Sequence, residues 1–311
     1  MTVSDNPPEP FPGHDHGVWA PVTGKVVASW PAGHFAENLV VDGSGVVLVS
    51  LHSHERIDAY HPATGTVTRF AQTPAPVAGL VFDGNGTLWA TGGRLGEPPG
   101  YVWRITGDGT CREWAQIPDA LFMNGCAMHP DGRTLLACES VTGRVLAIDL
   151  GTGAWRTWIS DDLLRPFGQQ IPGANGIKLR GGCAWVSVTA RNLLVQIPVL
   201  GGRSAGEPRI AAEHLRADDF AFAADGAAYV ATHPANTVLR LAPDGSRVTI
   251  AGPARGAVGS TACAFGRGKD AGGLYVTSNG GMWAPFHGSV EDAKLIRLEP
   301  PGGAWGTGER A

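Results

Sequence analysis

Four side chains with oxygen donors occupy the same position in a sequence motif that is repeated along the chain. Glu37, Asn124, Asn175 and Asp218 each open a segment with an apolar run, a Gly-containing turn and a second apolar run. Two carboxylates and two amide oxygens are hard ligands, which suit Ca²⁺ best and Mg²⁺ or Mn²⁺ next. Zn²⁺ is possible but less favoured, because no His or Cys joins the set.

The repeated motif predicts the fold that must bring these four residues together. Its six copies begin at residues 37, 78, 124, 175, 218 and 261, so successive starts lie 41, 46, 51, 43 and 43 residues apart. This spacing is typical of four-stranded propeller blades. The sequence therefore predicts an all-β, six-bladed β-propeller, with a sandwich or an open β-solenoid as the alternative.

Strand counting indicates how the ring closes. Alternating apolar segments supply a third strand to every copy of the motif and a fourth strand to all but the last. An unassigned strand-like segment, KVVASW from Lys25, precedes the first copy. Because sheets avoid long unpaired edges, we expect this segment to complete blade 6. One domain over residues 21–305 follows, preceded by a loose Pro-rich leader over residues 1–20.

Blade topology places the candidate site at one rim. The first strand of a blade starts at the face to which the second strand returns, so the opening residues share that rim with two sets of loops. These loops carry the candidate substrate-binding residues. They are His52, Arg94, Arg191, Asp219, His233, Asn279, Trp283 and Phe286.

Each of these residues also has a purely structural interpretation. Asn124 and Asn175 are each followed by Gly, and Asn-Gly pairs are common turn formers. Loop histidines and arginines are often solvated. Four oxygen donors at equivalent repeat positions nevertheless favour a shared site over coincidence.

Composition excludes several classes of function. The 311-residue chain has a net charge of −4 and only 17% charged residues, so it offers no basic stripe to a nucleic acid. No apolar run is long enough to span a membrane, and no signal peptide is evident. The five cysteines form no CxxC pair, which favours reduced thiols. We expect a cytoplasmic protein with a small-molecule substrate.

At its opening residues the chain resembles the senescence-marker-protein, gluconolactonase and luciferin-regenerating-enzyme family of calcium-dependent propellers. It resembles the diisopropyl-fluorophosphatase and paraoxonase group more distantly. The resemblance implies that Glu37, Asn175 and Asp218 hold a divalent cation and that Asn124 lies beside it or binds it. The chain departs from the pattern where Asp219, in place of Gly, follows Asp218, and where Phe122 and Met123 precede Asn124 without the usual substrate-binding Arg.

These observations lead to one functional hypothesis and two alternatives. The first is a metal-dependent hydrolase of a lactone or related cyclic ester, in which Asp218, or Asp219 beside it, is the general base and Asn124 orients the substrate. The second is a metal-dependent cyclase or isomerase that uses the same pocket. The third is a metal-free propeller, either a binding platform or one similar to strictosidine synthase.

Overall fold

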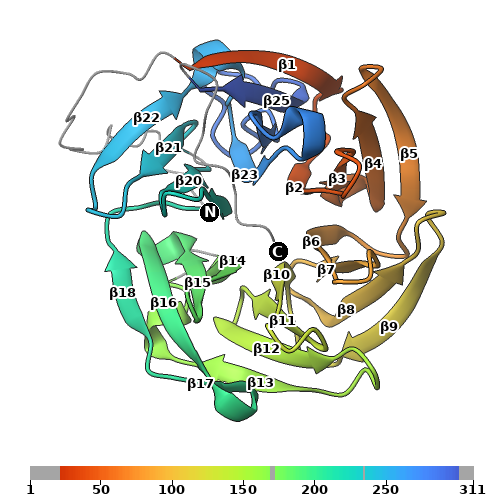
Figure 1. Ribbon diagram of the computed structural model, residues 1–311, viewed down its shortest axis with the longest axis vertical. Helices are drawn as coiled ribbons and strands as arrows, with labels where there is room; N and C mark the ends of the chain where they lie inside the picture. The colour runs from red at the N-terminus through yellow and green to blue at the C-terminus, as the bar shows by residue number, and fades with distance from the viewer. Residues whose placement is uncertain (1–21, 169–171, 234, 301–311) are drawn as a thin grey trace.

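The computed structural model describes residues 22–168, 172–233 and 235–300. These residues form six antiparallel sheets arranged as blades around a central axis (Figure 1). The described ranges contain short 3-10 turns but no α-helix. The six-bladed propeller predicted from the repeat is therefore confirmed, whereas the predicted leader, residues 1–20, lies outside the described residues.

The first three blades follow the chain in order, each running from the axis outward. Blade 1 consists of β2 (Ala36–Val41), β3 (Val47–Leu51), β4 (Arg56–His61) and β5 (Thr66–Gln72). Blade 2 consists of β6 (Val77–Phe82), β7 (Leu88–Arg94), β8 (Glu97–Ile105) and β9 (Cys111–Ile117). Blade 3 consists of β10 (Met123–Met128), β11 (Thr134–Glu139), β12 (Arg144–Asp149) and β13 (Trp155–Ser160).

The second half of the ring is less regular. Blade 4 consists of β14 (Ala174–Arg180), β15 (Cys183–Val188), β16 (Leu193–Leu200) and β18 (Arg209–Ala212), with a two-residue β17 (Ser204–Ala205) also paired to β16. Blade 5 consists of β19 (Phe220–Phe222), β20 (Ala228–Ala231), β21 (Val238–Leu241) and β22 (Arg247–Ala251). Blade 6 consists of β23 (Ser260–Phe265), β24 (Leu274–Ser278), β25 (Ala293–Glu299) and β1 (Thr23–Trp30).

In the described part of the chain, six 3-10 turns, labelled η1 to η6, lie between strands. They are η1 (His52–His54), η2 (Asp162–Leu164), η3 (Thr189–Arg191), η4 (Gly201–Arg203), η5 (Pro253–Arg255) and η6 (Gly268–Asp270).

The N-terminal strand closes the ring, as the sequence predicts. β1 pairs antiparallel with β25, from Thr23 opposite Glu299 to Trp30 opposite Ala293. It thus supplies the outer strand of blade 6, and β1 lies beside β25 at the perimeter of Figure 1. The strand that begins the described chain therefore completes the blade that ends it.

The hydrophobic core lies between blades. Six clusters of buried side chains each join two neighbouring blades, including one between blades 6 and 1. Six interfaces for six blades require a closed ring, because an open array of six blades has only five. Outer strands such as β5 expose most of their side chains, while β2 at the axis is almost wholly buried. All five cysteines are free thiols, as predicted.

No helix in the described ranges is long and apolar enough to cross a lipid bilayer.

Candidate functional site

The first strands of five blades contain a β-bulge at the opening residue, and in blade 5 the regular pairing of β19 begins only after Asp218 and Asp219. The pairing register shifts between Ala36 and Leu39, so Glu37 lies within the bulge, and shifts between Met123 and Cys126 place Asn124 likewise. The first strands of blades 2, 4 and 6 have the same irregularity. A bulge opposes two residues to one and changes the direction of a side chain. Here it places two consecutive residues opposite one at the axis, and in blade 5 Asp218 N and Asp219 O both bond to Ala231 in the same way.

The glycines that follow Asn124 and Asn175 allow the blades to approach one another. A Cβ added to Gly125 would lie 2.6 Å from the backbone oxygen of Asn175, and one added to Gly176 would lie 2.8 Å from the backbone oxygen of Asp218. Neither glycine has a positive φ angle. The Asn-Gly pairs are therefore close-approach positions inside strands, and the turn interpretation of these pairs is wrong.

Hydroxyl side chains on the second strands tie neighbouring blades together near the opening residues. Ser50 Oγ donates a hydrogen bond to the Ala78 backbone oxygen at 2.8 Å, and Thr91 Oγ1 donates to the Asn124 backbone oxygen at 2.5 Å. Ser187 Oγ donates in the same way to the backbone oxygen of Asp218. These contacts fix the opening residues around the axis before any ligand is considered.

The four predicted ligands are all buried at the hub. Their exposed fractions are 6% for Glu37, 3% for Asn124, 3% for Asn175 and 6% for Asp218. Asn175 Nδ2 donates to Asp218 Oδ1 at 2.6 Å, so blades 4 and 5 meet through these two side chains. Burial raises the pKa of Glu37 to about 8, with the nearby Asp219 as a second cause. Burial, followed by the charge of Glu37, raises the pKa of Asp218 well above its ordinary value.

Several oxygens of this set are not used by the protein. Glu37 Oε2 is buried and accepts no hydrogen bond from any described residue. Within the described ranges, no hydrogen bond reaches Asn175 Oδ1, and the Asn124 side chain makes none. A buried carboxylate without a partner is costly unless a cation compensates it. The donor set and its unused oxygens therefore fit a hard divalent cation.

Carboxylates, histidines and cysteines alone do not form a metal centre here. Among the described residues, no group of three or more of these side chains is arranged to hold an ion. A cation at the hub would therefore need the amide oxygens of Asn124 and Asn175 as well as the carboxylates. Such a mixed oxygen set is compatible with Ca²⁺ and unsuited to a Zn²⁺ site built on His and Cys.

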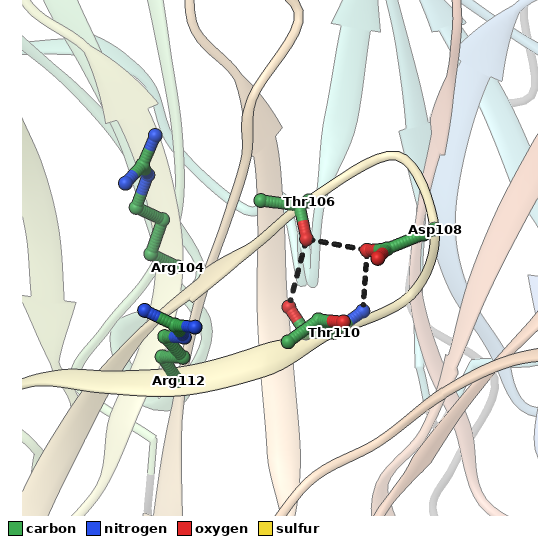
Figure 2. Close-up of a pocket in the computed structure, with 5 residues that line it drawn as sticks. All are labelled: Arg104, Thr106, Asp108, Thr110 and Arg112. Atoms are coloured by element: carbon green, nitrogen blue, oxygen red, sulfur yellow. Dashed lines mark hydrogen bonds between the residues drawn. The ribbon is translucent and has the colours of Figure 1, made fainter.

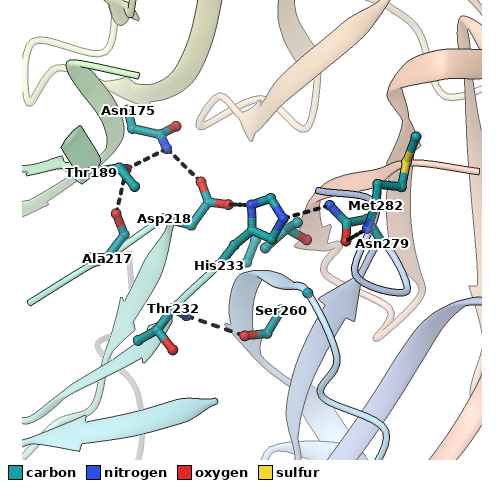
Figure 3. Close-up of polar contacts among 12 residues, drawn as sticks. Asn175, Thr189, Ala217, Asp218, Thr232, His233, Ser260, Asn279 and Met282 are labelled. Atoms are coloured by element: carbon teal, nitrogen blue, oxygen red, sulfur yellow. Dashed lines mark hydrogen bonds and ion pairs between the residues drawn. The ribbon is translucent and has the colours of Figure 1, made fainter. Parts of the chain in front are cut away.

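Asp218 also begins a row of polar contacts that runs through His233 to Asn279 (Figure 3). Asn279 Oδ1 accepts hydrogen bonds from the backbone N–H groups of Gly281 at 2.9 Å and Met282 at 3.3 Å. Its Nδ2 must therefore be the donor to His233 Nε2, at 3.1 Å. The proton of neutral His233 is consequently on Nδ1, which lies 3.6 Å from Asp218 Oδ2. Burial lowers the pKa of His233 to about 4, which favours this neutral form.

Asp219 belongs to a second layer of the channel. Its Oδ1 lies 2.6 Å from Lys178 Nζ, and its Oδ2 accepts a hydrogen bond from Asn38 Nδ2 at 3.0 Å. Asn38 and Asp219 fill the places that glycine takes after Asn124 and Asn175. Asn38 and Lys178 were not predicted as site residues, although Asn38 directly follows Glu37 in the repeated motif. Asp219 is held by this ion pair rather than directed at the rim.

Aromatic rings lie beside the ligand set. Phe35 packs against His52 at 5.7 Å and against Trp283 at 5.0 Å between ring centroids. His52 packs in turn against Phe122 at 5.5 Å, and Trp283 lies 5.2 Å from His233. His52, His233 and Trp283 were predicted rim residues. Phe35 and Phe122 were missed as site residues, although each precedes a predicted ligand by two positions.

The other predicted rim residues make contacts of their own. Arg94 forms an exposed ion pair with Glu55 at 3.0 Å. Arg191 Nε donates to the Arg165 backbone oxygen at 2.8 Å. The exposed Phe286 packs on His287 at 4.8 Å. Thus the structure brings His52, His233, Asn279 and Trp283 together with the ligands, and it gives Arg94, Arg191 and Phe286 contacts outside that group.

A surface depression of about 230 Å³ lies at the opposite face (Figure 2). It is lined by Arg104 near the end of β8, by Thr106, Asp108 and Thr110 on the turn that follows, and by Arg112 in β9. Asp108 Oδ1 accepts hydrogen bonds from Thr106 Oγ1 at 2.6 Å and from Thr110 N at 3.0 Å. These contacts stabilise the turn itself, so the depression is not part of the hub site.

No protein-family model matches the sequence, and no curated protein is similar to it by sequence. Solved structures are similar along most of its length. A luciferin-regenerating enzyme is 14% identical, with 93% of this chain and 100% of that one covered and a TM-score of 0.70. A gluconolactonase from Xanthomonas campestris is 14% identical, with 90% of each chain covered and a TM-score of 0.66.

The calcium-binding protein regucalcin from Agrobacterium tumefaciens is 17% identical, with 93% of this chain and 98% of that one covered and a TM-score of 0.65. At these identities the similarity shows a common fold. These three proteins carry names of the family that the opening residues resemble. What the chain does must be argued from its own site.

Proposed function

We propose that the protein is a divalent-cation-dependent hydrolase of a lactone or a related cyclic ester, with Ca²⁺ as the preferred ion. The observation that carries the proposal is the pair of buried carboxylates, Glu37 and Asp218. Asn175, which donates to Asp218, and Asn124, which opens blade 3, add side-chain oxygens that accept no hydrogen bond within the described ranges. Two neighbouring buried carboxylates repel one another, and a cation between them would relieve that repulsion. Solved propellers of the same fold named as gluconolactonase and calcium-binding regucalcin support the same assignment.

The residues of the site have separate roles in ester hydrolysis. The residues that would hold a divalent cation are Glu37, Asn124, Asn175 and Asp218, and the bound ion would polarise an ester carbonyl as a Lewis acid. Asp218 is the general base that accepts the proton of the attacking water. His233 presents its Nδ1–H to Asp218 Oδ2 at 3.6 Å and so favours the charged carboxylate, and Asn279 fixes the imidazole in this orientation. Asn124 orients the substrate.

Metal binding is tested without any substrate. After chelation and dialysis, addition of Ca²⁺ should raise the melting temperature, because a ligand that binds only the folded state stabilises it by RT ln(1 + [L]/Kd). Glu37→Gln should abolish most of this rise, whereas Asp42→Asn, in the exposed turn after β2, should leave it intact. An unchanged melt in Ca²⁺, Mg²⁺, Mn²⁺ and Zn²⁺ would argue for a metal-free propeller.

Turnover is tested with Asp218→Asn. The amide keeps the size of the side chain and one oxygen for the ion but cannot accept the proton of water. We expect the fold and part of the metal affinity to persist, while kcat for γ- and δ-lactones falls by at least about 100-fold, in keeping with the usual weight of general base catalysis. Activity equal to that of the wild type would remove Asp218 from the mechanism.

One observation favours a second function. The aromatic rings of Phe35, Phe122 and Trp283 suit a bulky apolar substrate, as a biosynthetic cyclase or isomerase would require. Such an enzyme would use the same cation to polarise a carbonyl without adding water. A calcium-binding protein that hydrolyses no lactone or aryl ester in the screen would point to this class.

A further inference from the structure

The residue two positions before an opening residue forms a second ring on the rim side of the ligands. In blade 1 this residue is Phe35, whose backbone oxygen accepts a hydrogen bond from His52 N at 2.8 Å. In blade 3 it is Phe122, whose backbone oxygen accepts from Ser140 N at 2.9 Å. In blade 5 the same position holds Arg216. Two phenylalanines and one arginine thus occupy alternate blades of the ring.

The two phenylalanines belong to a continuous aromatic wall, which we define as Trp283, Phe35, His52 and Phe122. Successive ring centroids along it lie 5.0, 5.7 and 5.5 Å apart, all in edge-to-face geometry. Phe35 and Phe122 are buried, whereas Trp283 remains 63% exposed. The wall therefore continues from the ligand set to the solvent-exposed rim.

Exposed apolar side chains gather on the same face. Of the eight large hydrophobic side chains that are exposed in the described ranges, half lie on rim loops; these four are Leu95, Phe167, Trp283 and Phe286. The other four lie on strands β1, β5, β16 and β18. Apolar groups exposed around a polar centre are a common sign of a ligand site. The wall offers few groups that could satisfy the hydroxyls of a sugar.

Arg216 is the charged residue of this second ring. Its side chain is half-buried, and its Nε is buried without a hydrogen-bond partner among the described residues. No ion pair within those ranges involves it, whereas Arg56 and Arg94 on the rim pair with Asp58 and Glu55. An unpaired, partly desolvated guanidinium favours a carboxylate, which it can bind through two hydrogen bonds.

We propose that the site takes a cyclic ester or lactone that carries an apolar ring and a carboxylate, rather than a polyhydroxylated sugar lactone. This inference rests on the proposed function for the reaction, but not for binding. The apolar ring packs on Phe35, Phe122 and Trp283, and the carboxylate pairs with Arg216. A sugar lactone would bury hydroxyls against the wall without partners, which a binding site disfavours.

Matched compounds test both contacts. The set consists of a phenyl-substituted γ-butyrolactone carboxylic acid, its carboxamide, unsubstituted γ-butyrolactone and glucono-δ-lactone. We expect the phenyl acid to have the highest kcat/KM in the calcium-loaded protein. Trp283→Ala should lower kcat/KM for both phenyl compounds by about tenfold more than for unsubstituted γ-butyrolactone. Arg216→Gln should lower it by about tenfold for the acid only.

Control variants separate these effects from general damage. Phe167→Ala removes an equally exposed rim aromatic outside the wall, and Arg112→Gln removes an exposed arginine of the opposite face. Neither should change the preference. Trp283 is exposed, so its variant should fold where Phe35→Ala, which empties a buried position, does not. A preference for glucono-δ-lactone, or an equal loss in variants and controls, would overturn the inference.

Binding without turnover distinguishes this inference from the proposed function. Calorimetry with the γ-lactam analogues of the phenyl acid and phenyl carboxamide measures the site when no ester is present. If the acid analogue binds, with loss in Trp283→Ala and in Arg216→Gln, while no lactone is hydrolysed, the inference stands and the hydrolase does not. If lactones are hydrolysed but neither variant changes lactam affinity, the hydrolase stands and the inference does not.

Discussion

Three buried carboxylates lie at the hub, and they differ in their partners. Asp219 has a cation of the protein's own, because Lys178 Nζ lies 2.6 Å from it. Among the described residues, Glu37 Oε2 has no hydrogen-bond partner, and the side chain of Asp218 contacts only an amide and a neutral imidazole. Burying a charge without compensation costs several kcal/mol. Glu37 and Asp218, the two carboxylates that open their blades, therefore lack a compensating charge. A bound cation would supply it.

A pH dependence of stability follows from His52. Burial lowers the pKa of this half-buried imidazole to about 4, below the value of 6.5 expected in the unfolded chain. The unfolded state therefore binds more protons between these pH values, so the stability from neutral His52 is complete above about pH 6.5 and lost toward pH 4. Between pH 7 and pH 5, His52→Gln should lose less unfolding free energy than the wild type, by up to about 2 kcal/mol. Equal losses in urea titrations of both proteins would contradict this assignment.

At the scale of the strand, the residue that follows each opening residue decides what faces the axis. Gly125 and Gly176 let the backbone of the next blade approach, while Asn38 and Asp219 place polar side chains in the channel instead. Hydroxyls on second strands then hold the opening residues from the neighbouring blade. The ligand geometry is therefore set by strand pairing and blade packing, without long loops.

Gly125→Ala tests this close approach. The new methyl group would lie 2.6 Å from the Asn175 backbone oxygen and 2.9 Å from Gly176 Cα, neither of which can rotate away. We expect a loss of about 1–3 kcal/mol in unfolding free energy, the usual cost of overpacking, together with weaker calcium stabilisation. Gly84→Ala is the matched control, because a Cβ there meets nothing within 4 Å and φ is not positive. Similar losses in both variants would show that packing at the axis is not the cause.

The same strands show how far sequence reasoning reaches in this chain. The repeat period predicted the blades, and the count of strands predicted that the segment from Lys25 completes blade 6, because both depend on local pattern. The roles of Gly125, Lys178 and Arg216 could not be read locally. A glycine for close approach and a glycine for a turn look alike in sequence, and the partner of Asp219 lies 41 residues away. In sequence, Phe35 and Phe122 look like ordinary core residues, and only the structure shows that their rings lie beside the ligands.

At the scale of the whole molecule, closure joins every blade to two neighbours (Figure 1). The interface between blades 6 and 1 includes Trp30 of β1 together with Leu39, Val49 and Tyr60 of blade 1. Glu37 lies in blade 1 and Asp218 in blade 5, so blade 6 separates them around the ring. Their approach at the hub therefore depends on the strand that closes blade 6.

Substitution of Trp30 tests how much this closure contributes to the unfolding free energy. Its side chain is 4% exposed, and its Nε1 donates to Asp58 Oδ2 of blade 1 at 2.9 Å. Trp30→Ala should lower the unfolding free energy by about 3–5 kcal/mol, because it leaves a cavity at the interface. Trp30→Phe keeps most of the packing and leaves Asp58 paired with Arg56, so it should cost only about 1 kcal/mol. Guanidinium unfolding measures both losses, and the calcium-induced rise in melting temperature should fall only in the alanine variant. Equal, small losses would mean that the ring holds its hub together without the closing strand.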